Sequence, residues 1–320
     1  MKTALMYVRE RNVILTEDQA SIEEALAAGL RQFWLDVESP GPEGVDWLAR
    51  RFKFHPLALE DLLQPTYRPK LEEYEDSLFL VAHSAGIATG KDTSGEVQSF
   101  LGRDFLVTVH DGTSPCIARV QRLVQADIRD PLRGPDYVLY LILNEMAISY
   151  FNLVDSLDDE IDQLETEVLR STDGQILDRI LDMRRILSAV RRISSYQRDA
   201  LSALASYQGI YIRRSNAVYV HDVHNLMVTV HEMVDSEREL TSGILDAHLS
   251  TMSNRLNNVV KGLTIVATIF LPIGFVASLF GVNFIQFMPF GSAVVFWLFI
   301  GTLLLAPAAM LVWFWRLGWF

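Results

Sequence analysis

Uncharged, apolar residues dominate the end of the chain. Residues 262–315 contain no Asp, Glu, Lys, Arg or His in 54 consecutive positions. Two stretches inside this block, Leu263–Phe284 (22 residues) and Ala293–Trp315 (23 residues), each exceed the ~20 residues that a helix needs to cross ~30 Å of hydrocarbon. The pattern therefore predicts two transmembrane helices joined by a short connector, 285–292.

A long helical pattern leads directly into the first span. Apolar side chains recur at spacings that add up to threes and fours, and no Pro occurs from Ser215 to Lys261. We predict one continuous helix from about Asn216 to Phe284, with Pro272 as a point of kinking. At ~1.5 Å per residue, such a helix is about 100 Å long. The rest of one chain cannot bury it, so it must pack on partners or on copies of itself.

Residues 136–214 are expected to form a helical hairpin with oppositely charged arms. The segment Asp155–Glu167 holds seven acids, and Arg179–Arg198 holds six arginines. The simplest interpretation is two antiparallel helices that pair these opposite charges. An acidic surface that collects cations is the alternative.

The first 135 residues alternate between strand and helix patterns, which indicates an α/β domain. The expected strands are Ala4–Val8, Asn12–Thr16, Gln32–Val37, Ser77–Ala82, Val97–Leu101 and Phe105–Val109. The expected helices are Asp46–Phe54, Pro56–Leu63 and Pro115–Asp127. The chain is thus divided into an α/β domain (1–135), the hairpin (136–214), a stalk helix (215–261) and a transmembrane module (262–320).

Composition excludes several classes of protein. The formal net charge is −12, and because all 40 acids but only 27 of the 28 basic residues precede position 262, the first 261 residues carry 27 − 40 = −13. The net negative charge of this body repels the many phosphates of a nucleic-acid backbone, so nucleic acid is not expected as a partner. A lone cysteine, Cys116, permits neither an internal disulfide nor a cysteine-based zinc site and suits a reducing compartment.

The N-terminus lacks the apolar core of a signal peptide, and basic residues indicate the orientation in the membrane. Arg255 and Lys261 precede the first span, Arg316 follows the second, and the connector carries no positive charge. The positive-inside rule then places both termini in the cytoplasm.

No motif of an enzyme is present: the sequence lacks a phosphate-binding glycine loop, HExxH and GxSxG, so we expect no catalytic activity. Polar residues near the membrane are more informative. Asn283, at the far end of the first span, either accepts hydrogen bonds from the water shell of Mg²⁺, which dehydrates reluctantly, or caps a helix end. The pair His221 and His224 either belongs to a zinc site or lies on a surface or interface.

A stripe of small or apolar residues follows Asn257 along one face of the same helix. This composition suits a narrow pore gated by apolar rings, and it equally suits ordinary helix packing in membranes. The stripe consists of Val260, Thr264, Ala267, Leu271, Gly274 and Ser278.

Several blocks of the sequence resemble the CorA family of divalent-cation transporters. The first span closes with Gly281-Val282-Asn283, which is similar to the Gly-x-Asn signature of the family, and residues 253–284 resemble its pore helix almost throughout. HPLALEDLLQPTYRPKLEEYED (55–76), SLDDEIDQLETEVL (156–169) and GILDAHLS (243–250) resemble further blocks in the same order. The resemblance covers nearly the whole chain.

The resemblance implies an α+β membrane protein: a funnel-shaped homopentamer with a cytoplasmic α/β domain, a long helical stalk and two C-terminal transmembrane helices in the inner membrane, surrounded by lipid. Five copies of Gly281, Val282 and Asn283 would form the selectivity filter. By the same matching, Asp246, Asn257, Val260, Leu263, Thr264, Leu271 and Gly274 would line the path. Glu60 and Asp61 on one chain and Asp222 on its neighbour would sense cytosolic Mg²⁺ across the subunit contact.

The resemblance implies channel-like transport of Mg²⁺, with Co²⁺ or Ni²⁺ as further ions. A zinc transporter of the related ZntB-like branch is the alternative, with slight support from the His221 and His224 pair. A non-conducting cation sensor or scaffold remains a third hypothesis. The sequence motivates it because the connector lacks the acids usual in the family, having Ile285, Gln286 and Phe290 instead, and the C-terminus lacks the lysine cluster of many relatives.

Overall fold

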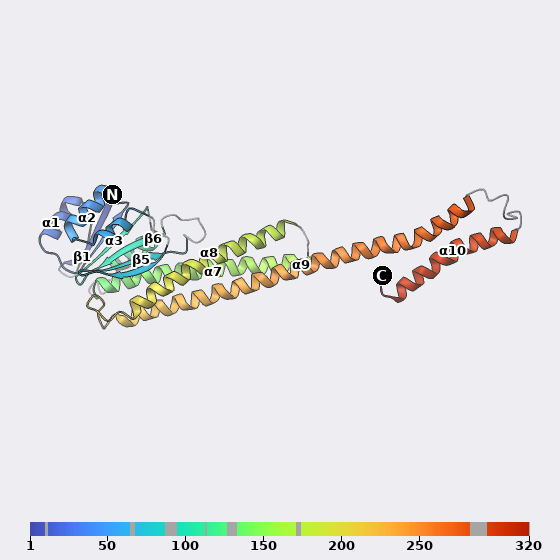
Figure 1. Ribbon diagram of the computed structural model, residues 1–320. Helices are drawn as coiled ribbons and strands as arrows, with labels where there is room; N and C mark the ends of the chain where they lie inside the picture. The colour runs from blue at the N-terminus through green and yellow to red at the C-terminus, as the bar shows by residue number, and fades with distance from the viewer. Residues whose placement is uncertain are drawn as a thin grey trace. The chain divides into compact units, whose positions relative to one another are not determined.

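A computed structural model describes residues 1–9, 12–64, 68–86, 95–112, 114–126, 133–170, 174–281 and 293–319 (Figure 1). The chain forms two compact units, Met1–Leu245 and Asp246–Phe320. The first contains one mixed sheet, the helices on its two faces and the first part of the long helix. The second contains the rest of the long helix and the last helix.

The sheet of the first unit has seven strands in the order β2-β1-β3-β7-β6-β5-β4. Only β3 and β7 pair in parallel, and the other neighbours are antiparallel. The strands are β1 (Lys2–Arg9), β2 (Asn12–Thr16), β3 (Phe33–Glu38), β4 (Lys70–Glu73), β5 (Leu78–His83), β6 (Glu96–Leu101) and β7 (Phe105–His110). The six strands expected from alternation are confirmed within one or two residues at each end.

Helices α1 (Gln19–Ala27), α2 (Gly41–Phe52) and α3 (Pro56–Asp61) cover one face of the sheet (Figure 1). Successive side chains of a strand point to opposite faces, so alternate residues such as Leu35 and Val37 build this core. The core also takes Ile22, Leu48 and Ala58 from the three helices.

Helices α5 (Pro115–Ala126), α7 (Pro135–Arg170) and α8 (Gly174–Ala205) pack on the other face. Figure 1 labels α7 and α8 on this side. This face buries a polar network. The hydroxyl of Thr108 donates to Asp36 Oδ1 (2.5 Å), and Gln121 Nε2 donates to Asp36 Oδ2 (3.1 Å). His110 places Nδ1 2.6 Å from the Gly112 carbonyl and Nε2 3.3 Å from Asp36.

Both ring nitrogens of His110 therefore face acceptors, an arrangement that suits the imidazolium, in which both nitrogens donate. Burial alone would lower the pKa of His110, but the hydrogen bond to Asp36, the charges of Asp36 and Glu38 and the Gly112 carbonyl together raise it above its usual value.

Two elements were not predicted. Helix α1 is short and buries only Ile22 and Leu26, although the side chain of Asp18 accepts a hydrogen bond from Ser21 N and so supplies an N-cap that the sequence could have revealed. Strand β4 lies at the edge of the sheet and reads KLEE, so its charged residues obscure the alternation.

Two long helices carry the predicted spans. Helix α9 runs without interruption from Ala217 to Gly281, and α10 runs from Ala293 to Arg316. By length and composition, α9 contains within Ala217–Ser278 an apolar window long enough to cross a membrane, and this window is not buried at all, whereas the described apolar part of α10, Ile300–Arg316, is shorter. Helix α7 passes the same test, but its window is 50% buried against the sheet domain, so we interpret α7 as a core helix.

Candidate ion pathway and regulatory carboxylates

The residues expected to line an ion path share one face of α9. At ~100° per residue they fall within about a third of the helix circumference. They are Asp246, Asn257, Val260, Leu263, Thr264, Leu271 and Gly274, and all are exposed in the single chain. Leu263 and Leu271 are 69% and 72% exposed, which an isolated chain in water would not sustain. This face of α9 therefore requires further protein or lipid around it.

Oxygen atoms of Thr264 and Thr268 on this part of α9 remain available as hydrogen-bond acceptors. The hydroxyl of Thr264 donates to the Val260 carbonyl (2.8 Å), so its oxygen can still accept. Pro272 lies inside α9 and has no N–H to donate to the carbonyl of Thr268, four residues earlier. A Cβ on Gly274 would meet no atom within 4 Å, so packing within one chain does not require this glycine.

The expected filter lies at the end of α9. Gly281 is the last residue of the helix. Val282 and Asn283, like the connector, lie outside the described residues, so their role as a filter stays a prediction.

Asp61, one of the expected regulatory carboxylates, already has a positively charged partner. It ends α3, and its Oδ2 lies 2.7 Å from Lys70 Nζ on the edge strand β4. Lys70 Nζ also lies 3.0 Å from Glu72 Oε1, and the Tyr74 hydroxyl donates to Glu72 Oε2 (2.8 Å). The side chains of Lys70 and Asp61 are only 30% and 28% exposed, which reduces the screening of this pair by water.

The titration of these groups reflects the ion pairs. Burial alone would lower the pKa of the Lys70 ammonium, but hydrogen bonds to Asp61 and Glu72 and their charges raise it above its usual value. Burial and the hydrogen bond to Glu72 raise the pKa of Tyr74 to about 12. Lys70 is therefore charged at neutral pH, and its ammonium lies directly beside the Asp61 carboxylate.

The expected sensor residues are not assembled into a metal site by one chain. Glu60 is exposed at the end of α3, and Asp222 is exposed on α9. Within the described ranges, no group of three or more His, Cys, Asp or Glu side chains could hold a metal ion. This finding applies equally to the pair His221 and His224, so a complete zinc site is not found in the described part of a single chain.

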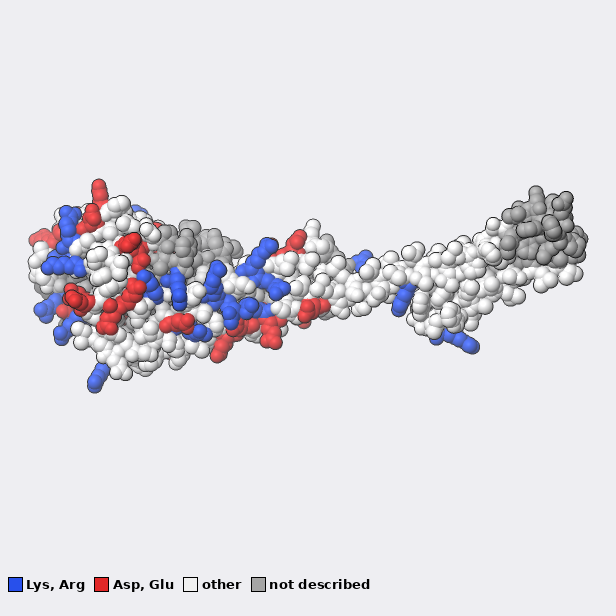
Figure 2. All heavy atoms as spheres, viewed as in Figure 1, with Lys and Arg blue, Asp and Glu red and all other residues white. Residues whose placement is uncertain are grey.

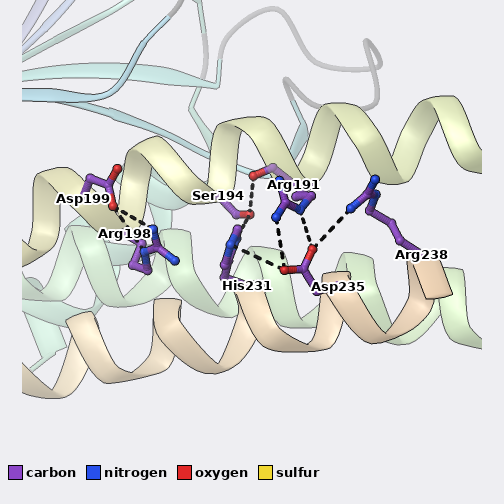
Figure 3. Close-up of polar contacts among 7 residues, drawn as sticks. All are labelled: Arg191, Ser194, Arg198, Asp199, His231, Asp235 and Arg238. Atoms are coloured by element: carbon purple, nitrogen blue, oxygen red, sulfur yellow. Dashed lines mark hydrogen bonds and ion pairs between the residues drawn. The ribbon is translucent and has the colours of Figure 1, made fainter.

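The arginines of α8 pair differently from the expectation. Among the ion pairs of the described residues, Arg179–Glu167 is the one that joins α7 to α8. Arg191 instead binds Asp235 of α9 through Nε and Nη2, and Arg238 lies 3.5 Å from the same carboxylate (Figure 3). The expected pairing of opposite charges between the two helices is confirmed for Arg179 and Glu167 but wrong for Arg191, because α9 supplies the carboxylate that Arg191 binds.

His231 completes this cluster. Its Nδ1 lies 3.2 Å from the hydroxyl of Ser194, and its Nε2 lies 3.8 Å from Asp235 (Figure 3). Burial and the nearby charge of Arg198 lower the pKa of His231. The ring is therefore neutral at pH 7 and serves as a hydrogen-bonding group between α8 and α9.

The seven acids between Asp155 and Glu167 of α7 remain largely in solvent: six of them are exposed, and Glu167 is partly buried. One buried carboxylate of α9, Glu237, faces them. Burial and the charges of Asp158 and Asp162 raise the pKa of Glu237. Sequence reasoning found neither Glu237 nor Asp235, since Asp158 and Asp162, which face Glu237, and Arg191, which binds Asp235, are more than 40 positions away in the chain.

Comparison with known proteins agrees with the geometry of the long helix and the sheet domain. Residues 31–316 match the family described as CorA-like Mg²⁺ transporter protein. The chain belongs to the CorA family. It is a family of membrane-embedded transporters, which accounts for the two apolar helices.

Individual relatives cover most of the chain. A metal ion transporter named YfjQ from Bacillus subtilis (strain 168) is 33% identical over 306 residues, covering 93% of both chains. The cobalt/magnesium transport protein CorA of Thermotoga maritima is 33% identical over 251 residues, covering 74% of this chain and 68% of its own. The complete structure of the CorA magnesium transporter from Methanocaldococcus jannaschii superposes with a TM-score of 0.85 at 23% identity, covering 100% of this chain and 99% of that one, which confirms the fold.

Proposed function

We propose that this CorA-family chain transports Mg²⁺, and also Co²⁺, across the inner membrane as a homopentamer with both termini in the cytoplasm. The observation that carries the proposal is the long apolar part of α9, the stripe included, which one chain leaves exposed. A ring of identical chains covers such a stripe and turns it inward, since cyclic assemblies bury the same face of every subunit. Names of relatives support the choice of ions.

The stripe suits a hydrated ion. Val260 and Leu271 would form apolar rings that a narrow path can dewet, and the hydroxyl oxygen of Thr264 lies between them along the helix. At the end of α9, five Asn283 side chains would accept hydrogen bonds from the water shell of Mg²⁺. This outer-shell contact avoids stripping an ion that sheds water reluctantly.

Regulation would act at the contact between subunits. Asp61 with Glu60 on one chain and Asp222 on the next would repel each other, and a bound cation would relieve this repulsion and hold the ring closed. The described residues of one chain hold no complete metal site, so the proposed site would need carboxylates from two chains.

The test is uptake by proteoliposomes that contain purified protein. Replacing Asn283→Ala should abolish Mg²⁺ flux while size-exclusion chromatography shows an unchanged oligomer. Asn225→Ala is the matched control, because Asn225 is an exposed asparagine of α9 in the first unit, outside the stripe. Unchanged flux in the Asn283 variant would refute the assignment of the filter.

A zinc transporter is the second candidate, favoured only by His221 and His224 one helical turn apart on α9. Flux measured separately with Mg²⁺ and Zn²⁺, with and without a pH gradient, separates the two. Zinc flux that is driven by a pH gradient and lost in His221→Ala, with no Mg²⁺ flux, would favour the second candidate. Absence of any flux from intact pentamers would favour a sensor or scaffold.

A further inference from the structure

A polar hollow lies between α8 and α9 in the first unit. It has a volume of about 320 Å³. Its lining consists of Ser188, Arg191, Arg192, Ser195 and Tyr196 of α8 and Arg238 of α9. Three arginines and three hydroxyl-bearing residues thus line one space, and no acidic residue belongs to the lining.

The carboxylate of Asp235 orients two of the three arginines. Asp235 accepts from Nε and Nη2 of Arg191 and lies 3.5 Å from Arg238 Nη1, as Figure 3 shows for the two side chains converging on this carboxylate. Each guanidinium has five N–H donors, so both retain donors that Asp235 does not use. A ligand would therefore find arginines already ordered and would not bear the full entropic cost of fixing them.

The third arginine has no anionic partner. Arg192 is exposed and makes no ion pair with any residue in the part of the chain that the structure describes. A further cation flanks the wall of the hollow, because the guanidinium of Arg68 stacks 4.4 Å from the ring centroid of Tyr196. Figure 2 shows basic side chains gathered in the region of the helical hairpin. The three lining arginines carry three positive charges and Asp235 carries one negative charge, so these four residues have an excess of two positive charges.

We propose that this arginine pocket binds a tetrahedral oxyanion, namely a phosphate group that is either free or carried by a nucleotide. A phosphate near neutral pH carries close to two negative charges, which matches the excess in the pocket. Its oxygens accept from several guanidinium and hydroxyl groups at once, and arginine is the side chain best suited to such contacts. The bound group would link α8 to α9, the helix that continues into the first span.

Equilibrium dialysis of the full chain in detergent, in metal-free buffer at constant ionic strength, tests the proposal. Radioactive inorganic phosphate and a nucleoside triphosphate are the two probes. The probe with the higher affinity identifies whether the bound phosphate group is free or carried by a nucleotide. We expect saturable binding of one phosphate group per chain. Arg192→Gln and Arg238→Gln should each weaken it at least about tenfold, since each removes charged hydrogen bonds.

Arg184→Gln is the matched control, because Arg184 is an exposed arginine of the same helix outside the hollow, and this variant should bind normally. Absence of saturable binding, or equal weakening in the control, would overturn the proposal. The proposal would also be overturned if the wild type bound no phosphate and Arg192→Gln dissociated the oligomer. That result would indicate that acidic side chains of a second copy fill the pocket. Because binding is measured without flux, failure of the transport proposal leaves this test unaffected.

Discussion

Removing the positive charge of Lys70 should make the protein more sensitive to Mg²⁺. Lys70 Nζ lies 2.7 Å from Asp61, so its ammonium competes with any cation that approaches this carboxylate. Lys70→Met keeps the aliphatic stem and removes the charge. The side chains of Lys70 and Asp61 are each about 30% exposed, and an ion pair with this exposure has an interaction free energy of about 1 kcal/mol. A difference of 1 kcal/mol corresponds to a factor of about five in affinity.

The assay is protection of the purified oligomer from proteolysis as Mg²⁺ is raised. We expect the midpoint concentration to fall about fivefold in Lys70→Met. The control is Lys2→Met, which removes a lysine that is 80% exposed and 3.5 Å from Glu38 in the same sheet, and it should leave the midpoint unchanged.

A double variant assigns the effect to the right carboxylate. Lys70 also lies 3.0 Å from Glu72, so its loss frees two acids. In the Asp61→Asn background, Lys70→Met should no longer change the midpoint, because coupled residues are not additive. An unchanged or higher midpoint in the single variant would refute the competition between Lys70 and Mg²⁺, and a persistent shift in the double variant would assign it to Glu72.

Three further predictions concern stability, measured as the thermal unfolding midpoint in detergent. Burial lowers the pKa of His110 in the folded state, but Asp36 raises it by more, so the stabilising contribution of His110 is complete below pH ~6.5 and is lost as pH rises through the folded pKa. The difference in unfolding midpoint between wild type and His110→Gln should therefore shrink from pH 5.5 to pH 8. A difference that grows over this range would contradict the reasoning. Glu237→Gln should raise the midpoint by about 2 °C at pH 7.5, because it removes a buried charge that Asp158 repels, and a fall would show that the carboxylate has a cationic partner. Asp235→Asn should cost no more than about 1 kcal/mol, because its side chain and both arginine partners are at least 40% exposed; a larger loss would indicate that assembly buries the cluster.

Much of the sheet domain was predictable, since alternation of apolar residues reports which face of a strand is buried. Six strands follow this rule closely, and helices α3 and α5 begin at the residues predicted for them. The misses have local causes: α1 buries too few residues for a periodic signal, and β4 is a charged edge strand. Pairing of distant charges could not be predicted, because the sequence shows which residues are charged but not which of them meet.

The sequence by itself determined the membrane-spanning character of the chain and the position of the candidate pore face. A run of 54 uncharged residues suits hydrocarbon whatever surrounds it, and residues at helical spacing share a face in any α-helix. Only the tertiary structure decided that Asp61 meets Lys70 and that Arg191 and Arg238 converge on Asp235. These contacts join separate elements of the fold, and they form because the sheet order and the packing of α8 on α9 bring those elements together.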